Sequence, residues 1–179
     1  MPDSSILLSA EAMDERLDFL ANALISAHGG CDKLALIGIQ RRGVVIAEEL
    51  CRRMSHTLGQ QVRMGSLDIT LYRDDWTTLS GKPSVGQTHI RFDVEGKNLV
   101  LVDDVLFTGR TIRAALEALT DFGRPSKVEL LVLVDRGHRE LPIHPDYAGL
   151  TVATKKSDHV DVLVSAIDGE NGVRLVTGN

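Results

Sequence analysis

Short apolar runs alternate along the chain with longer segments in which apolar residues recur at helical spacing. From Ser9 to Ala27 the apolar residues lie three or four positions apart, and Ser9 can serve as the N-cap of a helix. The same spacing predicts helices over 44–58 and 111–122, the second of them closed by Gly123 and Pro125. The pattern therefore predicts three main helices.

Four segments instead have the pattern of strands: 34–39, 62–72, 98–102 and 127–134. Most of these runs are apolar without alternating polar residues, which is typical of strands buried on both faces. Near the C-terminus, "VDVLVSAID", the turn "GENG" and "VRLVT" predict a hairpin. Because strands and helices alternate, we expect an α/β fold with a mainly parallel β-sheet flanked by helices on both faces.

Residues 73–90, "RDDWTTLSGKPSVGQTHI", are polar and rich in turn-forming residues. A segment of this length without regular structure is usually a lid or a binding loop when it interrupts a compact domain. The chain has 179 residues, which is enough for one sizeable core. We therefore expect a single domain over residues 1–179.

Composition and charge narrow the class of protein. Apolar residues make up 43% of the chain and aromatic residues only 4%, as in a globular protein with an aliphatic core. The net charge is -5, so a nucleic-acid site would have to be a local basic patch. Cys31 and Cys51 lack the spacing of metal ligands, which favours two buried thiols in a reducing compartment.

The sequence gives no sign of a membrane segment. No apolar run approaches the ~20 residues that a membrane span requires. The N-terminal stretch "MPDSSILLSAEAMDERLDF" has acidic residues where a signal peptide has a basic start. We expect a cytoplasmic protein without a membrane partner.

The stretch "LVLVDDVLFTGRT" places two adjacent carboxylates at the end of an apolar strand. In open α/β sheets ligands bind at the carboxyl ends of the strands, which is where Asp103 and Asp104 fall. Two neighbouring ionised carboxylates repel each other unless a ligand compensates them. A divalent cation or a pair of hydroxyls, such as the diol of a ribose, would do so.

A phosphate site is expected directly after this pair. Thr108 to Thr111 would form a turn that opens the next helix, where backbone N–H groups, two hydroxyls and the positive helix end converge. A sugar 5-phosphate fits both features. A nucleoside triphosphatase also has an acidic strand end, but it requires a G-x-x-x-x-G-K-[ST] loop, which the sequence lacks.

These residues resemble a known motif. The segment "VLVDDVLFTGRTI" (100–112) resembles the phosphoribosyl pyrophosphate (PRPP) motif of type I phosphoribosyltransferases. The segments "DITLYRDD" (68–75) and "VLVDRGHRELPIHPDYAG" (132–149) resemble the PyrR family, whose members regulate pyrimidine operons and act as uracil phosphoribosyltransferases. The resemblance extends from about Ile6 to the C-terminal hairpin.

The resemblance implies the type I phosphoribosyltransferase fold, with a flexible lid loop and a C-terminal hairpin. It also implies transfer of the phosphoribosyl group from PRPP to uracil, which yields uridine monophosphate (UMP) and pyrophosphate. Mg²⁺ would bind mainly through PRPP, with Asp103 and Asp104 nearby as the catalytic pair. The implied ribose and 5-phosphate site consists of Asp103, Asp104, Val105, Leu106, Phe107, Thr108, Gly109, Arg110 and Thr111.

Two further segments match the family around the reacting centre. In "GIQRRGVVIAEEL", Arg41, Arg42 and Gly43 would bind pyrophosphate, although the family typically has one arginine before the glycine and this chain has two. Tyr72 and Arg73 would begin the lid, which closes to exclude water. Relatives place a basic residue near position 86, where this chain has glycine. Taken by itself, the arginine loop could also be a solvated basic turn.

The base pocket is expected after the strand that ends near residue 134. Arg136 would lie beside the uracil ring, and Val160 resembles the second wall of the pocket. Taken alone, Arg136 could equally form a surface salt bridge.

RNA binding is the second activity that the resemblance implies, with uridine nucleotides (UMP or UTP) as co-regulators and pyrimidine operon leader mRNA as the partner. RNA recognition requires a local basic surface. The candidate contacts are His138, Arg139, His144 and Lys156. The first helix departs from the family pattern at Asp18, Phe19 and Asn22, and its carboxylates would repel phosphates.

Three functions therefore stay open from the sequence. The first is an enzyme that makes UMP, the second an RNA-binding regulator that uses its site only as a nucleotide sensor, and the third a type I transferase for another base. The motifs at 68–75 and 132–149 argue against the third. A homo-oligomer, dimeric or larger, is our default expectation for assembly.

Overall fold

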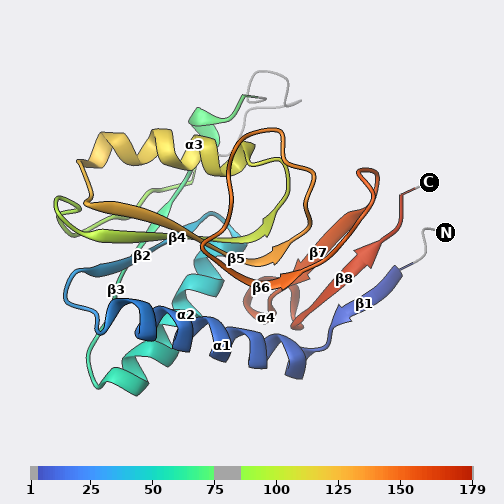
Figure 1. Cartoon of the computed structure of the whole chain (residues 1–179), viewed down its shortest axis with the longest axis horizontal. Helices are drawn as coiled ribbons and strands as arrows, with labels where there is room; N and C mark the ends of the chain where they lie inside the picture. The colour runs from blue at the N-terminus through green and yellow to red at the C-terminus, as the bar shows by residue number, and fades with distance from the viewer. Residues whose placement is uncertain (1–3, 75–85, 179) are drawn as a thin grey trace.

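The structure is a computed structural model that describes residues 4–74 and 86–178. Its centre is a five-stranded parallel sheet with the strand order β3-β2-β4-β5-β6 (Figure 1). The strands are β2 (Leu34–Ile39), β3 (Arg63–Leu67), β4 (Asn98–Leu106), β5 (Lys127–Asp135) and β6 (Tyr147–Thr151). The predicted parallel sheet is confirmed.

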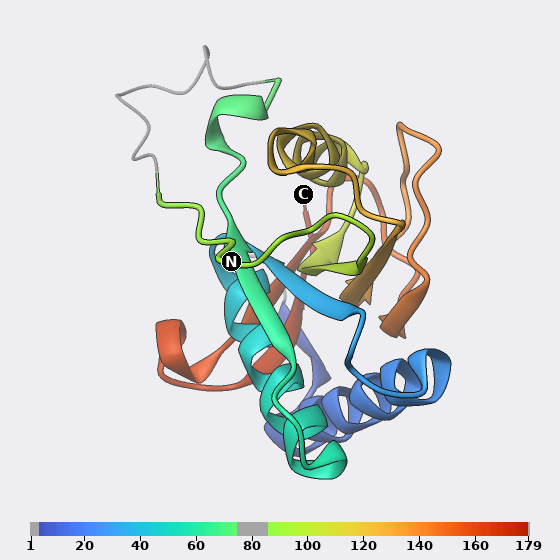
Figure 2. The same cartoon turned by 90° about the vertical axis from the view of Figure 1, so that its left-hand side faces the viewer.

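Helices cover both faces of this sheet. Helices α1 (Ala10–His28) and α2 (Arg42–Leu58) lie on one face, and α3 (Arg110–Leu119) lies on the other (Figure 2). Along β4, Val100 and Val102 belong to the core with α1 and α2, whereas Leu99 and Leu101 belong to the core with α3. Burial on both faces is the reason that this strand has no polar alternation.

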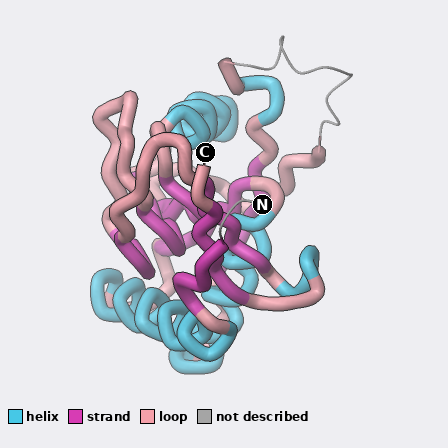
Figure 3. The backbone as a smooth tube through the Cα atoms, turned by 90° about the vertical axis from the view of Figure 1, so that its right-hand side faces the viewer, coloured by secondary structure: helices cyan, strands magenta, loops and turns pink. Residues whose placement is uncertain are grey.

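A small second sheet stands beside the carboxyl ends of the main strands. It consists of β1 (Ser4–Leu8), β7 (His159–Leu163) and β8 (Gly172–Val176) in the order β1-β8-β7, with antiparallel pairing throughout. A short helix, α4 (Ser165–Asp168), connects β7 to β8. The start of β1 pairs with the end of β8, so the first and last described segments of the chain lie side by side (Figures 1 and 3).

The predicted elements are confirmed with shifted boundaries. Ser9 caps α1 by accepting a hydrogen bond from the Ala12 N–H at 3.2 Å. The predicted strand over 62–72 is too long, because the Asp68 carboxylate accepts the Thr70 N–H at 2.8 Å and turns the chain into a 3-10 helix, Thr70–Tyr72. The helix predicted over 111–122 ends as α3 at Leu119 and continues as the 3-10 helix Thr120–Phe122.

Four elements were missed or misjudged. Strand β4 was predicted to end at 102 but continues to Leu106, so Asp103 and Asp104 lie within the strand. Strands β1 and β6 were not predicted, and the end of "VDVLVSAID" forms α4 rather than strand. These segments are short, and their neighbours in space stabilise them more than any local pattern does.

Two predictions from composition, on the cysteines and on membrane segments, can be compared with the structure. Cys31 and Cys51 are both buried and free, and burial raises the pKa of the Cys51 thiol to about 12. Within residues 4–74 and 86–178, no helix is both long enough and apolar enough to cross a membrane. Of the predicted lid, residues 75–85 lie outside the described part of the chain.

Candidate active site

A cavity of about 720 Å³ opens between the carboxyl ends of the parallel strands and the small sheet. Its walls combine two arginines, three aspartates, an aromatic ring and the apolar side chains of β7. The lining residues are Arg42, Asp104, Val105, Phe107, Arg136, Lys156, Asp158, His159, Val160, Asp161, Val162 and Leu163. The structure thus brings Asp104, Arg42, Arg136 and Val160 together around one space.

The two adjacent aspartates have different environments. Asp104 lines the cavity, whereas Asp103 is not among the residues that line it. Asp103 is only 6% exposed and accepts a hydrogen bond from the Asp104 N–H at 3.0 Å. Burial, together with the charge of Asp104, raises the pKa of Asp103 well above its ordinary value.

The predicted phosphate turn lies at the N-terminus of α3. Gly109 has a positive φ of 92°, which glycine adopts without strain, and α3 begins at the next residue. The Arg110 N–H points back to the Thr108 hydroxyl at 3.3 Å. A second cavity of about 300 Å³ adjoins this turn and is lined by Arg73, Asp74, Phe107, Thr108, Arg110 and Thr111.

The Arg110 side chain is already neutralised by protein groups. Its Nε donates to Glu140 at 2.8 Å and its Nη1 donates to Asp74 at 2.9 Å. The phosphate-binding capacity of the turn therefore comes from its backbone N–H groups and from the Thr108 and Thr111 hydroxyls.

The predicted pyrophosphate loop packs against its neighbours so closely that two positions require glycine: Gly43 meets β4, and Gly38 of β2 meets the start of α2. A Cβ on Gly43 would lie 2.4 Å from the Val102 carbonyl oxygen, and a Cβ on Gly38 would lie 2.5 Å from the Val44 Cα. This contact places the start of α2 beside the Asp103–Asp104 end of β4. Gly43 therefore serves close packing, and the charge of the loop comes from its arginines.

Arg41 and Arg42 differ in their partners. Arg42 forms a bidentate pair with Asp168 of α4, with Nη2–Oδ1 at 2.7 Å and Nε–Oδ2 at 3.3 Å. Arg41 is exposed, and its side chain makes no hydrogen bond or ion pair with any residue in the described ranges. Nothing in the local sequence indicated Asp168, because its partner lies 126 positions away.

The predicted base pocket contains a stacked cation. The guanidinium carbon of Arg136 lies 4.0 Å from the centre of the Phe107 ring, and Arg136 Nη2 donates to the Lys155 carbonyl at 3.0 Å. Burial lowers the pKa of Arg136, which is only 4% exposed. Val160, on β7, is 5% exposed. Arg136 is therefore part of the cavity wall and not of a surface salt bridge.

The base of the predicted lid is attached to α3. The Tyr72 hydroxyl donates to Asp121, and the Tyr72 carbonyl accepts from Arg113 at 2.8 Å. Asp74 accepts from Arg113 at 2.6 Å, and Arg73 lines the phosphate-side cavity. Gly86 is exposed, and a Cβ there would lie 2.7 Å from an oxygen of Asp68.

The predicted RNA contacts divide into two groups. Arg139 is largely buried and donates to the carbonyls of Phe107, Gly137 and Ile143 and to the Asp135 carboxylate. His138 Nε2 lies 2.6 Å from the Thr154 carbonyl. In contrast, His144 and Lys156 are exposed, and Lys156 lies 3.4 Å from Glu140. The geometry gives Arg139 a structural part in the loop after β5.

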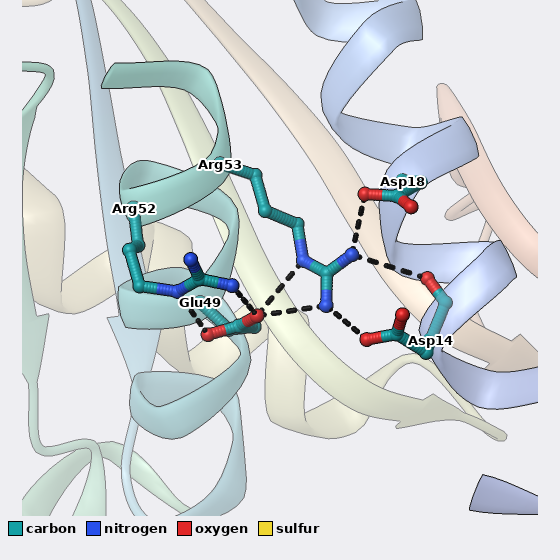
Figure 4. Close-up of polar contacts among 5 residues, drawn as sticks. All are labelled: Asp14, Asp18, Glu49, Arg52 and Arg53. Atoms are coloured by element: carbon teal, nitrogen blue, oxygen red, sulfur yellow. Dashed lines mark hydrogen bonds and ion pairs between the residues drawn. The ribbon is translucent and has the colours of Figure 1, made fainter. Parts of the chain in front are cut away.

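The acidic face of α1 is compensated by α2. Arg53 of α2 donates to Asp14 and Asp18 of α1 and, at 2.9 Å, to Glu49 on its own helix (Figure 4). Arg52 pairs with the same Glu49 at 2.6 Å (Figure 4). Three carboxylates and two guanidiniums thus form one network, and the repulsion predicted for Asp18 is correspondingly weakened.

The residues suit a cation only as part of a substrate complex. In the described part of the chain, no group of three or more His, Cys, Asp and Glu side chains is arranged to bind a metal ion. Asp104 presents a carboxylate to the cavity, which is the hard oxygen ligand that Mg²⁺ accepts. Such an ion would take its other ligands from phosphate groups and water.

Known proteins share this architecture. A family model for the phosphoribosyl transferase domain matches residues 3–165. A hypoxanthine phosphoribosyltransferase from Staphylococcus aureus superposes with a TM-score of 0.69 at 18% identity and covers 98% of this chain and 92% of its own. A variant of the hypoxanthine phosphoribosyltransferase from Trypanosoma cruzi gives a TM-score of 0.73 at 20% identity, with 98% and 96% covered. At these identities the solved structures establish the fold.

Sequence relatives are much more similar. The "Bifunctional protein PyrR" of Thermus thermophilus is 50% identical over 169 residues, which cover 94% of this chain and 93% of that protein. The protein of the same name from Elusimicrobium minutum is 45% identical over 174 residues and covers 97% of both chains. Together with the cavity that Asp104, Arg42 and Arg136 line, these matches show that the chain belongs to the PyrR family of phosphoribosyltransferases.

Proposed function

We propose that this protein is a uracil phosphoribosyltransferase that also regulates pyrimidine operon expression by binding leader RNA in response to UMP or UTP. The observation that carries the enzymatic part is the single cavity onto which Asp104, Arg42 and the Arg136–Phe107 pair converge. The remainder of the proposal concerns assembly: one domain over residues 1–179, in a homo-oligomer.

The ribose and phosphate groups of PRPP occupy the end of β4 and the turn that follows. The Asp104 carboxylate accepts hydrogen bonds from the ribose diol at the cavity wall. The backbone N–H groups of 108–111 bind the 5-phosphate, with the positive end of α3 behind them. Asp103 supports this arrangement by accepting the Asp104 N–H.

Pyrophosphate lies at the start of α2. As the bond between C1 of the ribose and the pyrophosphate oxygen breaks, negative charge accumulates on the leaving group and the sugar becomes cationic. Arg41 and Arg42 stabilise the leaving group, and the carboxylates near C1 stabilise the sugar. Asp103 and Asp104 would lie near a Mg²⁺ ion bound through PRPP, which would neutralise further charge on the phosphates.

Uracil occupies the part of the cavity between Arg136 and Val160. A flat, small ring fits between the stacked Arg136–Phe107 pair and the apolar side chain of β7. Catalysis then rests mainly on two effects: positioning of uracil N1 against ribose C1, and stabilisation of the charges that develop on the sugar and the leaving group. The lid that begins at Tyr72 and Arg73 excludes water from this centre.

The decisive experiment is a transferase assay with four bases. Purified protein with PRPP and Mg²⁺ is expected to convert uracil to UMP, whereas hypoxanthine, guanine and orotate react poorly. Asp104→Asn should lower the rate by about 100-fold, as is typical when a preorganised charged contact is lost. Omission of the divalent metal should abolish transfer.

Each alternative has its own result in this assay. A preference for a purine or for orotate would identify a transferase for another base. Nucleotide-dependent RNA binding without transfer to any base would identify a regulator that uses the cavity only as a sensor. Near-normal rates in Asp104→Asn would remove that residue from the site.

A further inference from the structure

The small sheet contributes a fixed carboxylate to the arginine loop. Asp168 forms a bidentate pair with Arg42, and the same carboxylate accepts the Val164 N–H at 2.9 Å. The Asp168 N–H in turn donates to the Val164 carbonyl at 2.8 Å. Two hydrogen bonds with Val164 therefore fix the position of Asp168 independently of Arg42.

This pair is a rigid element at the edge of the cavity. The hydrogen bond from Arg42 is the main cause that lowers the pKa of Asp168, so the carboxylate stays ionised at neutral pH. Arg42 lines the cavity, and its side chain is 37% exposed against 17% for Asp168. The guanidinium is thus held from the side of the small sheet while part of it stays accessible.

Donor counting shows what remains for a ligand. A guanidinium has about five N–H donors, of which the bidentate pair uses one on Nε and one on Nη2. The others are available to an anion, in an orientation that the planar pair fixes in advance. Arg41 has no such partner among the described residues, so it is not preorganised in the same way.

We propose that Asp168 is a positioning residue for the pyrophosphate group: it fixes the Arg42 guanidinium so that its remaining donors bind the pyrophosphate of PRPP. This inference rests on the proposed function, because it assigns a supporting residue to the same site. It also links α4, which follows β7 on the uracil side of the cavity, to the start of α2, which forms the pyrophosphate side.

The test is a pair of single variants and their double variant. Asp168→Asn keeps an oxygen for the Val164 N–H but loses the charge that fixes Arg42. We expect the KM for PRPP and the Kd for inorganic pyrophosphate to rise about three- to tenfold, the factor for one long side chain that must be ordered on binding. The kcat and the KM for uracil should change much less.

The double variant separates positioning from a general structural role. In an Arg42→Ala background, Asp168→Asn should have no further effect on pyrophosphate affinity, because its only route to the ligand is gone. Glu170→Gln is the matched control: Glu170 is an exposed acid two residues along the chain that pairs with Arg174 at 2.9 Å. It should leave pyrophosphate affinity unchanged.

Four results would overturn the proposal. These are an unchanged pyrophosphate affinity, a tighter one, equal effects of Asp168→Asn with and without Arg42, and an increased Mg²⁺ requirement. A tighter affinity would mean that Asp168 competes with the anion, and an increased Mg²⁺ requirement would mean that it acts on the metal. Calorimetric titration with pyrophosphate needs no turnover, so failure of uracil transfer and failure of this proposal are distinguishable.

Discussion

At the scale of single residues, the two adjacent aspartates have divided roles. Asp104 lines the cavity, whereas Asp103 is buried and does not line it. The unfolded chain holds Asp103 at an ordinary pKa of 3.8, and the fold raises that pKa. Between the two values the folded state binds the extra proton, so this residue's contribution to stability falls as the pH rises through that range.

Asp103→Asn removes this ionisable group, so its contribution to the pH dependence of stability should disappear. In buffer without metal or phosphate, we expect the difference in Tm between the variant and the wild type to move in favour of the variant as the pH rises from about 4. It should level off above the folded-state pKa. Thermal melts at several pH values measure this, with Glu170→Gln as the control. A difference that does not change with pH would show that Asp103 is not linked to folding through its proton.

At the scale of elements, one arginine connects the loop after β5 to the loop after β4. Arg139 donates to the Phe107 carbonyl at 3.0 Å and to the Ile143 carbonyl at 2.9 Å, and it pairs with Asp135 at 2.6 Å. Phe107 in turn lies under Arg136 and immediately before the phosphate turn. Arg139 therefore joins the loop that carries Arg136 to the loop that carries Phe107.

Arg139→Ala should consequently weaken the fold and the PRPP site together. The substitution removes the donor for three carbonyls and the Asp135 carboxylate. A buried acceptor left without a hydrogen bond costs about 1–3 kcal/mol of stability. We expect a decrease in Tm of roughly 2–10 °C for a domain of this size, with a raised KM for PRPP. Melting curves and kinetics of Arg139→Ala and of Arg139→Lys, which keeps one donor group, measure this. Reduced RNA binding with an unchanged Tm would instead return Arg139 to the RNA surface.

At the scale of the whole molecule, charged groups of both signs lie together on two faces. The α1–α2 face holds three carboxylates and two guanidiniums in one network (Figure 4). Lys156 and His159 both line the cavity and are each 71% exposed, and their acidic partners are Glu140 and Asp161. Lys156 carries a full positive charge and lies 3.4 Å from Glu140, so it offers a phosphate backbone a positive contact at the cavity rim.

RNA affinity should follow this distribution. We expect Lys156→Gln to weaken binding of a pyrimidine operon leader RNA and to reduce its salt dependence by about 0.7 log units per log unit of salt. Asp18→Asn should have a smaller effect, because Asp18 is paired with Arg53. Salt titrations with and without UMP measure this. Lys33→Gln is the control, since exposed Lys33 precedes β2 at the amino ends of the parallel strands, away from the cavity at their carboxyl ends. An equal loss in that control would mean that the RNA binds elsewhere.

The sequence by itself determined the elements whose signals are local. Unbroken apolar runs specify buried strands, and Ser9, Gly123 and the helical spacing specify where helices begin and end. The motif from Val100 to Ile112 is contiguous, so the carboxylates and the phosphate turn were predictable together. Contiguity made this part of the site predictable, because neighbours in the chain stay neighbours in any fold.

Only the tertiary structure decided the contacts between distant segments. The pairing of β1 with β8, the Arg42–Asp168 pair and the compensation of Asp18 by Arg53 each join residues that are far apart in the chain. The different environments of Asp103 and Asp104 also depend on packing, because β4 continues through both residues and pairs with β5 as far as Leu106. The residues packed around an aspartate decide its burial and its charged partners. The same residue type can therefore line a cavity as Asp104 does, pair with an arginine as Asp168 does, or be buried as Asp103 is.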